Sequence, residues 1–406
     1  MSPRRVAVVG GGFAGVAAAW AFRKRNLAVT LIEDRAGSSE FYSGIVYGDV
    51  AAYAEASRNF AEELGLWRSW SLESRANSQV NDASVGEWNA STQGIVVPSI
   101  AADRAILNLA EVAGKRVGVA DLGRDDMNAK LLAAVLAEQS WARKTHTQFV
   151  AVPVNGLKLS NERRIPVADF AALHDAPERT AWLAAQLSEH TGYDAWLLGP
   201  WLGVDEDVAA RLRTELGIPV GEVGSRPGGT AGARWSCARS KMLARWGVVP
   251  ERARLVRVTL TDTGAQLSLQ PDEGEGRILE VDAVVLATGG VAAGGIVMEG
   301  SLAHSHSERL KLSYLAPLEL ELDGDVLSAS DPSLPLALQS DLGVLERIGV
   351  GSHIGIHSHI GQSAHEPFKG RLEVAGDMLA GQSRTVAAAV TSGIAASERL
   401  LSRFEK

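Results

Sequence analysis

The sequence has a single cysteine, Cys237, among 406 residues. It therefore cannot form an intrachain disulfide, nor an iron–sulfur cluster ligated within this chain, since such a cluster takes about four cysteines. No charge-free apolar run in the sequence reaches the roughly 18 to 20 residues that a membrane-spanning helix needs. The net charge of −8 disfavours a large basic surface for nucleic acid. We therefore expect a cytoplasmic protein without a membrane span.

A dinucleotide-binding pattern is present near residue 10. An apolar strand expected at residues 6–9 runs into Gly10-x-Gly12-x-x-Gly15 and an alanine-rich helix, and a second strand at residues 28–32 precedes Glu33. The glycines permit a tight turn, a close approach to a pyrophosphate and close packing of the helix on the strand. The helix N-terminus attracts phosphate, and Glu33 can accept hydrogen bonds from a ribose hydroxyl. A glycine-rich turn without a ligand fits this context less well.

Two segments late in the chain favour FAD. One expected strand ends in Thr288-Gly289, and another ends in Gly376-Asp377 before a helix expected from Thr385 to about Phe404. Asp377 would accept hydrogen bonds from sugar or ribityl hydroxyls, and the helix N-terminus would face the flavin edge that becomes negative on reduction. Two acids, Glu33 and Asp377, suit the extended FAD better than FMN. The candidate cofactor-binding residues are Gly10, Gly12, Phe13, Ala14, Gly15, Glu33, Asp34, Arg35, Ser43, Gly44, Thr288, Gly289, Gly376, Asp377, Arg384 and Thr385.

The middle of the chain alternates between strand and helix patterns, with strands expected at residues 115–120, 149–154 and 195–199. Such alternation implies parallel pairing with right-handed crossovers. We therefore predict an α/β protein. A discontinuous Rossmann-like FAD-binding domain would comprise residues 1–94 and 223–406, and an inserted α/β cap or substrate domain would comprise residues 95–222.

Another helix is expected across residues 50–71, with Trp67 and Trp70 packing against the core. A further helix is expected from about Ala233 to Trp246, after a turn-rich segment that contains Arg226.

Histidines and arginines are the candidates for chemistry on a substrate. The spacing His353-x3-His357-x-His359 fits structural or surface histidines, a substrate contact with a general base, or a metal site. The metal interpretation is the weakest, because no paired carboxylate supports it, and we predict no metal site. Arginine binds carboxylate or phosphate through a planar fork. The candidate catalytic residues are His353, His357, His359 and Arg384, and the candidate substrate-binding residues are Arg226 and Arg234, although each arginine alone also fits a solvated charge or a salt bridge.

The sequence resembles the B-subunit family of anaerobic glycerol-3-phosphate dehydrogenase, within the two-dinucleotide-binding-domain flavoproteins. The segments that carry the resemblance are Phe41-Tyr-Ser-Gly44, Val97-Pro-Ser-Ile-Ala-Ala-Asp103, Gly114-Lys-Arg-Val-Gly-Val, Ala195-Trp-Leu-Leu-Gly-Pro-Trp-Leu-Gly-Val-Asp205, Pro227-Gly-Gly229-x-Ala-Gly232-x-Arg234, and Ala287-Thr-Gly-Gly290 with Gly294-Gly295. The resemblance implies a flavin-dependent dehydrogenase whose partner subunits pass electrons toward quinone, peripheral to a membrane through a partner. The family is often described with FMN, whereas the two acids named above indicate FAD here.

We therefore expect an FAD-dependent oxidoreductase that transfers hydride between the flavin and a small hydroxylated substrate, which can be anionic, and passes electrons to a partner or to quinone. One alternative is a stand-alone biosynthetic flavoprotein oxidase or reductase. Another is a non-catalytic subunit that binds flavin and transfers electrons.

Overall fold

The computed structural model describes residues 4–35, 37–47, 55–68, 86–299, 307–316, 318, 320–322, 325–327, 336–339, 354–356 and 370–404. Their contacts divide the chain into two compact units. Unit 1 takes Met1–Ser39, Ala54–Phe60 and Met242–Lys406, and unit 2 takes Glu40–Tyr53 and Ala61–Lys241. These limits differ from the predicted domain boundaries at 94/95 and 222/223. Those boundaries remain a prediction about which segments fold independently.

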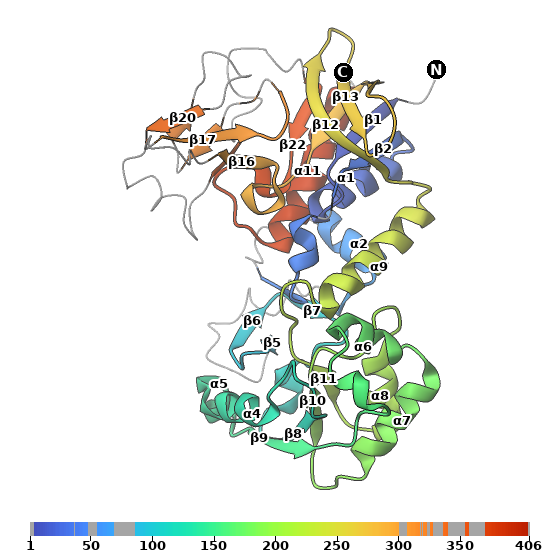
Figure 1. The fold of residues 1–406 in the computed structure, drawn as a ribbon, viewed down its shortest axis with the longest axis vertical. Helices are drawn as coiled ribbons and strands as arrows, with labels where there is room; N and C mark the ends of the chain where they lie inside the picture. The colour runs from blue at the N-terminus through green and yellow to red at the C-terminus, as the bar shows by residue number, and fades with distance from the viewer. Residues whose placement is uncertain are drawn as a thin grey trace. The chain divides into compact units, whose positions relative to one another are not determined.

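Unit 1 is built on a seven-stranded sheet with the order β14-β13-β12-β2-β1-β15-β22. Figure 1 labels β1, β2, β12, β13 and β22 of this sheet. The five strands from β12 to β22 are parallel, and β13 and β14 extend the sheet by antiparallel pairing. This is the Rossmann-like α/β arrangement that the sequence predicts. The strands are β1 (Arg5–Val9), β2 (Ala28–Glu33), β12 (Glu251–Leu260), β13 (Ala265–Pro271), β14 (Arg277–Val281), β15 (Ala283–Leu286) and β22 (Leu372–Val374).

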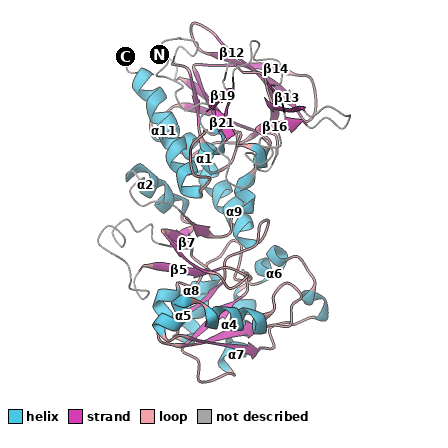
Figure 2. Cartoon of the chain, turned by 90° about the vertical axis from the view of Figure 1, so that its left-hand side faces the viewer, coloured by secondary structure: helices cyan, strands magenta, loops and turns pink. Residues whose placement is uncertain are grey.

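Helices α1 (Phe13–Lys24) and α11 (Val386–Phe404) lie side by side in unit 1 (Figure 2). Glycine allows the close approach, because a Cβ at Gly393 would lie 2.1 Å from the carbonyl oxygen of Ala14. The Ser397 hydroxyl also donates a hydrogen bond to the Ala18 carbonyl at 3.2 Å. Small residues, mostly alanine, therefore allow the two helices to pack closely. The predicted C-terminal helix is confirmed.

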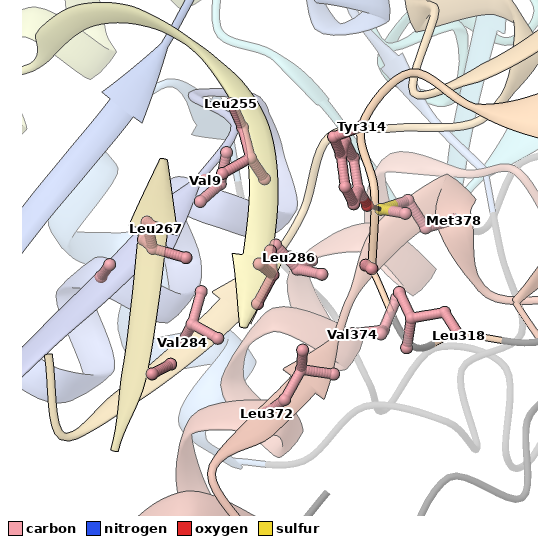
Figure 3. Close-up of a cluster of buried hydrophobic side chains, with 14 of the residues drawn as sticks. Val9, Leu255, Leu267, Val284, Leu286, Tyr314, Leu318, Leu372, Val374 and Met378 are labelled. Atoms are coloured by element: carbon pink, nitrogen blue, oxygen red, sulfur yellow. Dashed lines mark hydrogen bonds between the residues drawn. The ribbon is translucent and has the colours of Figure 1, made fainter. Parts of the chain in front are cut away.

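A cluster of buried apolar side chains fills the core of unit 1 (Figure 3). It joins the parallel strands, through residues such as Val9 and Leu286, to β12 and β13, through Leu255 and Leu267. Unit 1 also contains the short helices η5 (Val291–Ala293) and η6 (Gly376–Met378), and the strands β16 (Ile296–Glu299), β17 (Ser307–Leu312), β18 (Leu320–Leu322), β19 (Asp325–Leu327), β20 (Leu336–Gln339) and β21 (Ile354–Ile356). The short helix η1 (Ser38–Phe41) has its first two residues in unit 1 and its last two in unit 2.

Unit 2 contains a four-stranded parallel sheet with the order β11-β10-β8-β9. Two helices, α4 and α5, pack on one face of this sheet, and α6, α7 and α8 pack on the other. The alternating pattern thus forms the parallel α/β unit that it predicts. The elements are β8 (Arg116–Asp121), α4 (Ala129–Glu138), α5 (Ser140–Thr145), β9 (Gln148–Pro153), η4 (Ser160–Arg163), α6 (Val167–Leu173), α7 (Pro177–Ser188), β10 (Ala195–Leu198), α8 (Val208–Leu216) and β11 (Val220–Glu222). Helix α9 (Thr230–Arg245) belongs to unit 2 up to Lys241 and to unit 1 from Met242.

The helix predicted across residues 50–71 is shorter in the structure. Helix α2 spans Glu55–Leu64 and ends at Gly65, which has a φ of +69°. Trp67 and Arg68 form strand β4, which pairs with β7, so the prediction is wrong at these two residues. Trp67 is buried as expected, and Trp70 lies outside the described residues. The remaining elements are β3 (Ile45–Val46), β4 (Trp67–Arg68), β5 (Glu87–Ala90), β6 (Val96–Ser99), β7 (Ala101–Asp103) and η3 (Leu109–Val112).

One fully buried histidine lies at the end of α6. The His174 ring packs edge-to-face on Phe170, with the ring centroids 4.9 Å apart. Burial, assisted by the positive charge of Arg179, lowers the pKa of His174 from 6.5 to about 4. The neutral imidazole is therefore the form that the fold accommodates.

Acidification is expected to destabilise the fold through His174. The unfolded chain takes up a proton as pH falls through 6.5, whereas the folded chain resists until about pH 4. The stability that depends on the neutral ring is thus complete above pH 6.5 and decreases below it, by about 2 kcal/mol between pH 7 and pH 5. Urea unfolding at both pH values measures this change. His174→Leu should flatten this pH dependence, whereas the exposed control His146→Asn should retain it; an unchanged slope in His174→Leu contradicts the prediction.

Candidate functional site

The turn between β1 and α1 is the first part of the site. Gly10 has a φ of +111°, and a Cβ there would lie 2.1 Å from the Ala287 carbonyl oxygen. A Cβ at Gly15 would lie 1.8 Å from the Gly10 carbonyl oxygen, so α1 packs directly on this turn. Gly12 caps α1 without a side-chain hydrogen bond, and no acidic residue occupies the first helical turn. The positive end of the helix dipole is therefore not offset by a carboxylate on α1.

The short helix η1 brings hydroxyl groups to this helix terminus. Ser39 accepts a hydrogen bond from the backbone N–H of Phe13 at 3.0 Å, and a Cβ at Gly12 would lie 2.8 Å from the Ser39 hydroxyl oxygen. The neighbouring Ser38 makes a hydrogen bond to Asp377. Neither serine was predicted from the sequence. The available signal was two adjacent small hydroxyl residues in the polar loop after Glu33.

The turns after β15 and β22 lie close to each other. Gly289 and Gly376 have φ values of +75° and +73°, which favour glycine. A Cβ at Gly290 would lie 2.8 Å from the Asp377 carbonyl oxygen, and one at Gly376 would lie 2.9 Å from the Ala14 Cβ. The predicted segments at residues 10–15, 288–290 and 376–377 therefore meet in unit 1.

Asp377 supplies a carboxylate where these three segments come together. Burial raises its pKa above the usual value of 3.8, and Arg384 and the hydrogen bond from Ser38 oppose this rise. Arg384 itself is exposed. It precedes Thr385, whose hydroxyl accepts a hydrogen bond from the backbone N–H of Ala388 at the start of α11. Asp377 is thus held in a less polar setting while a guanidinium group supports its charge.

Glu33 ends β2 on the same sheet and is half-buried. Its register partner on the neighbouring strand β12 is Arg252, whose guanidinium contacts the carbonyl oxygen of Asp34 at 3.5 Å. Arg35 donates a hydrogen bond to the Gly294 carbonyl at 3.1 Å. The loop after β2 is therefore fastened to the turn after β15.

This geometry agrees with a family comparison. Residues 5–156 match the family model described as FAD dependent oxidoreductase. The cofactor is FAD. No curated protein matches the sequence.

Solved structures of flavoproteins show a distant likeness to the chain. One is a flavoprotein/dehydrogenase from Cytophaga hutchinsonii, with 9% identity over 100% of this chain and 79% of that one, at a TM-score of 0.36. Another is the aromatic hydroxylase CabE from angucycline biosynthesis, with 12% identity over 99% of this chain and 63% of that one, at a TM-score of 0.34. The flavin-dependent brominase Bmp2, as a triple mutant, has 11% identity over 98% of this chain and 80% of that one, at a TM-score of 0.36. The chain spans 59 to 63% of the length of the three structures that match first.

The residues of unit 1 fit FAD. The glycines add no side chain of their own between the strand ends and the N-terminus of α1, where a pyrophosphate can approach N–H groups beside the Ser39 hydroxyl. Glu33 and Asp377 supply carboxylates for hydroxyl groups of the cofactor. The predicted residues that lie in unit 1 are Gly10, Gly12, Phe13, Ala14, Gly15, Glu33, Asp34, Arg35, Thr288, Gly289, Gly376, Asp377, Arg384 and Thr385. Their individual contacts with FAD remain predictions.

The remaining cofactor candidates, Ser43 and Gly44, belong to unit 2. The Ser43 carbonyl accepts a hydrogen bond from the backbone N–H of Ser225 at 2.7 Å. Gly44 has a φ of +92°, and a Cβ there would lie 2.5 Å from Cδ1 of Ile106. These contacts account for both residues within unit 2, so their role toward FAD stays a prediction.

Arg234 makes structural contacts inside unit 2. It was predicted to bind an anionic substrate, but its side chain is buried and paired with carboxylates inside unit 2. It donates to the two carboxylate oxygens of Glu222 at 2.6 and 2.9 Å and lies 3.4 Å from Oδ1 of Asp103. Its Nε and Nη2 also donate to the carbonyls of Gly203 and Leu202. The hydrogen bonds of the Arg234 guanidinium therefore stabilise the folded structure of unit 2.

The pKa shifts agree with this structural role. Burial alone would lower the pKa of Arg234, but the negative charges of Asp103 and Glu222 raise it above the usual value, so Arg234 stays charged. Burial raises the pKa of Glu222, and Arg234 opposes that rise. The other predicted substrate-binding residue, Arg226, is exposed in unit 2, and its role stays a prediction.

The candidate catalytic histidines His353, His357 and His359 lie outside the described residues. Among the described residues, no group of three histidine, cysteine or acidic side chains is arranged to hold a metal ion. Within the same described part of the chain, every helix is too short or too polar to cross a membrane.

Proposed function

We propose that this chain is an FAD-dependent dehydrogenase that transfers hydride between the flavin and a small hydroxylated substrate, which can carry an anionic group. We propose further that electrons pass to a partner subunit or to quinone. The observation that carries the proposal is the buried Asp377 carboxylate, whose pKa the nearby positive charge of Arg384 lowers, in the unit that also contains the glycine turn at residues 10–15. The resemblance to the B-subunit family of anaerobic glycerol-3-phosphate dehydrogenase supports the electron route.

FAD supplies a hydride acceptor or donor when it is bound. The chain must then bind the substrate, orient its reacting carbon and manage one proton. Arg384 is exposed beside a cofactor turn, and its planar guanidinium can bind a carboxylate or phosphate through two hydrogen bonds. His353, His357 and His359 are the proposed proton acceptors, because imidazole titrates near neutral pH.

Anaerobic titration tests the proposal directly. The FAD-loaded protein is mixed with glycerol 3-phosphate and with other hydroxy acids, and the oxidised flavin band at about 450 nm is followed. We expect one of these compounds to bleach the band and an artificial quinone to restore it. A band that none of them changes contradicts the dehydrogenase proposal.

The variant Arg384→Leu tests the anion site in the same titration. Loss of a charge-assisted hydrogen-bonded pair should raise the half-saturating substrate concentration by about 10- to 100-fold. Arg254→Leu, which removes an exposed arginine from β12, is the matched control and should have no effect. Turnover with oxygen or NAD(P)H without any partner instead supports a stand-alone biosynthetic enzyme. A stable redox partner in a pull-down, with Arg384→Leu and His357→Ala both silent, supports an electron-transfer subunit.

A further inference from the structure

Three side chains, the half-buried Thr288 and the buried Tyr314 and Met378, connect the two turns that follow β15 and β22. The Thr288 hydroxyl donates a hydrogen bond to Sδ of Met378 at 2.8 Å. The Tyr314 hydroxyl lies 3.3 Å from the Thr288 hydroxyl oxygen, and it contacts Sδ of Met378 at 3.5 Å. Tyr314 is 4% exposed and Met378 is 0% exposed, and Figure 3 shows the phenol oxygen directed at the sulfur. The turns are thus joined by side-chain contacts inside the core.

The backbone around Tyr314 fixes where its hydroxyl can lie. On one side, the Ser313 N–H donates to the Gly295 carbonyl at 3.0 Å, within the turn after β15. On the other, the Leu315 N–H donates to the Val256 carbonyl of β12 at 2.9 Å, and the Leu315 carbonyl accepts from Val258 at 2.8 Å. Tyr314 is therefore fastened both to the sheet and to one of the turns that it connects.

The spacing of these turns matters because they carry the cofactor residues. Met378 directly follows Asp377, and Thr288 directly precedes Gly289. The turns already touch, since a Cβ at Gly290 would lie 2.8 Å from the Asp377 carbonyl oxygen. A shift of either turn would therefore move the Asp377 carboxylate relative to Gly289 and to the N-terminus of α1.

We propose that the Tyr314 hydroxyl is a positioning group that sets the separation of the two turns and thereby the affinity for FAD. The inference rests on FAD as the cofactor and does not depend on the identity of the substrate. Burial raises the pKa of Tyr314 above its usual value, so the phenol remains a neutral hydrogen-bonding group at ordinary pH. Thr288 and Met378 transmit its position to the backbone on either side.

Tyr314→Phe is the decisive variant, because it removes only the hydroxyl and keeps the ring in the core. We expect its Kd for FAD, measured by quenching of flavin fluorescence, to rise by about 3- to 10-fold, the effect of one to two neutral hydrogen bonds. The visible circular dichroism of the bound flavin should also change shape at saturation. Met378→Leu should raise the Kd similarly, and adding Tyr314→Phe to it should raise the Kd by less than Tyr314→Phe does alone, because the contact between the Tyr314 hydroxyl and Sδ is already lost while the contact with Thr288 remains.

Leu267→Val provides the control for a purely structural role. Leu267 is fully buried in the same apolar cluster, so this variant should lower the thermal unfolding midpoint of the apoprotein and leave the Kd for FAD and the flavin dichroism unchanged. The proposal is overturned if Tyr314→Phe behaves like this control, lowering the midpoint without changing Kd or dichroism. A wild-type chain that binds no FAD overturns the cofactor assignment together with this inference, whereas failure of every tested substrate leaves the Kd comparison valid.

Discussion

Replacing Gly15 with alanine is expected to weaken FAD binding by at least about 100-fold, which corresponds to roughly 3 kcal/mol. The new methyl group would lie 1.8 Å from the Gly10 carbonyl oxygen and 3.4 Å from Cγ1 of Val8. Neither the turn nor the buried strand can yield without displacing α1, because Gly10 is held by its hydrogen bond to the Ile32 carbonyl. Moving α1 would displace the N–H groups that we expect to bind the pyrophosphate.

Gly37→Ala is the matched control for this prediction. Gly37 lies in the loop after β2, and a Cβ there would have no atom within 4 Å. Both purified variants are titrated with FAD, and their unfolding midpoints are compared without cofactor. A Kd for Gly15→Ala within about threefold of the wild type, a difference of well under 1 kcal/mol, would mean that the turn is not the pyrophosphate site, even if the variant is less stable.

The sequence predicted the glycine turns of unit 1 because local geometry determines them. Gly10 needs a positive φ and a close approach to a neighbouring strand, and glycine alone meets both conditions. Apolar runs likewise predicted the parallel strands, and the alanine-rich sequence at the end of the chain predicted α11. The hydrogen bond between the Ser39 hydroxyl and the N–H of Phe13 could not be predicted from the sequence, because it depends on how the polar loop after β2 packs against the start of α1.

The structural contacts of Arg234 could not be predicted for a related reason. An arginine beside a glycine-rich segment fits an anion site, and the sequence does not reveal that Glu222 and Asp103 face it from different strands. Strand β4 shows the same limit: Gly65, with its φ of +69°, ends α2, but pairing with the distant strand β7 decides that Trp67 and Arg68 form a strand. In both cases contacts between residues distant in sequence decide the outcome.

Arg234→Met is accordingly expected to destabilise unit 2 by about 3 to 5 kcal/mol, because it leaves two buried carboxylates without their cation. Glu222 and Asp103 are each 1% exposed, so water cannot replace the guanidinium without opening the core. Urea unfolding measures the loss. Arg211→Met, which breaks an exposed ion pair with Glu206, is the control and should change stability by no more than about 1 kcal/mol.

A second substitution separates the structural role of Arg234 from the substrate role first predicted for it. Adding Glu222→Leu to Arg234→Met removes one of the stranded charges, so the double variant should be more stable than Arg234→Met alone. A substrate-binding arginine would give the opposite pattern: Arg234→Met would unfold at nearly the wild-type urea concentration, and its half-saturating substrate concentration would rise. Because the Arg234 guanidinium already bonds to buried carboxylates and backbone carbonyls of unit 2, we expect the first pattern.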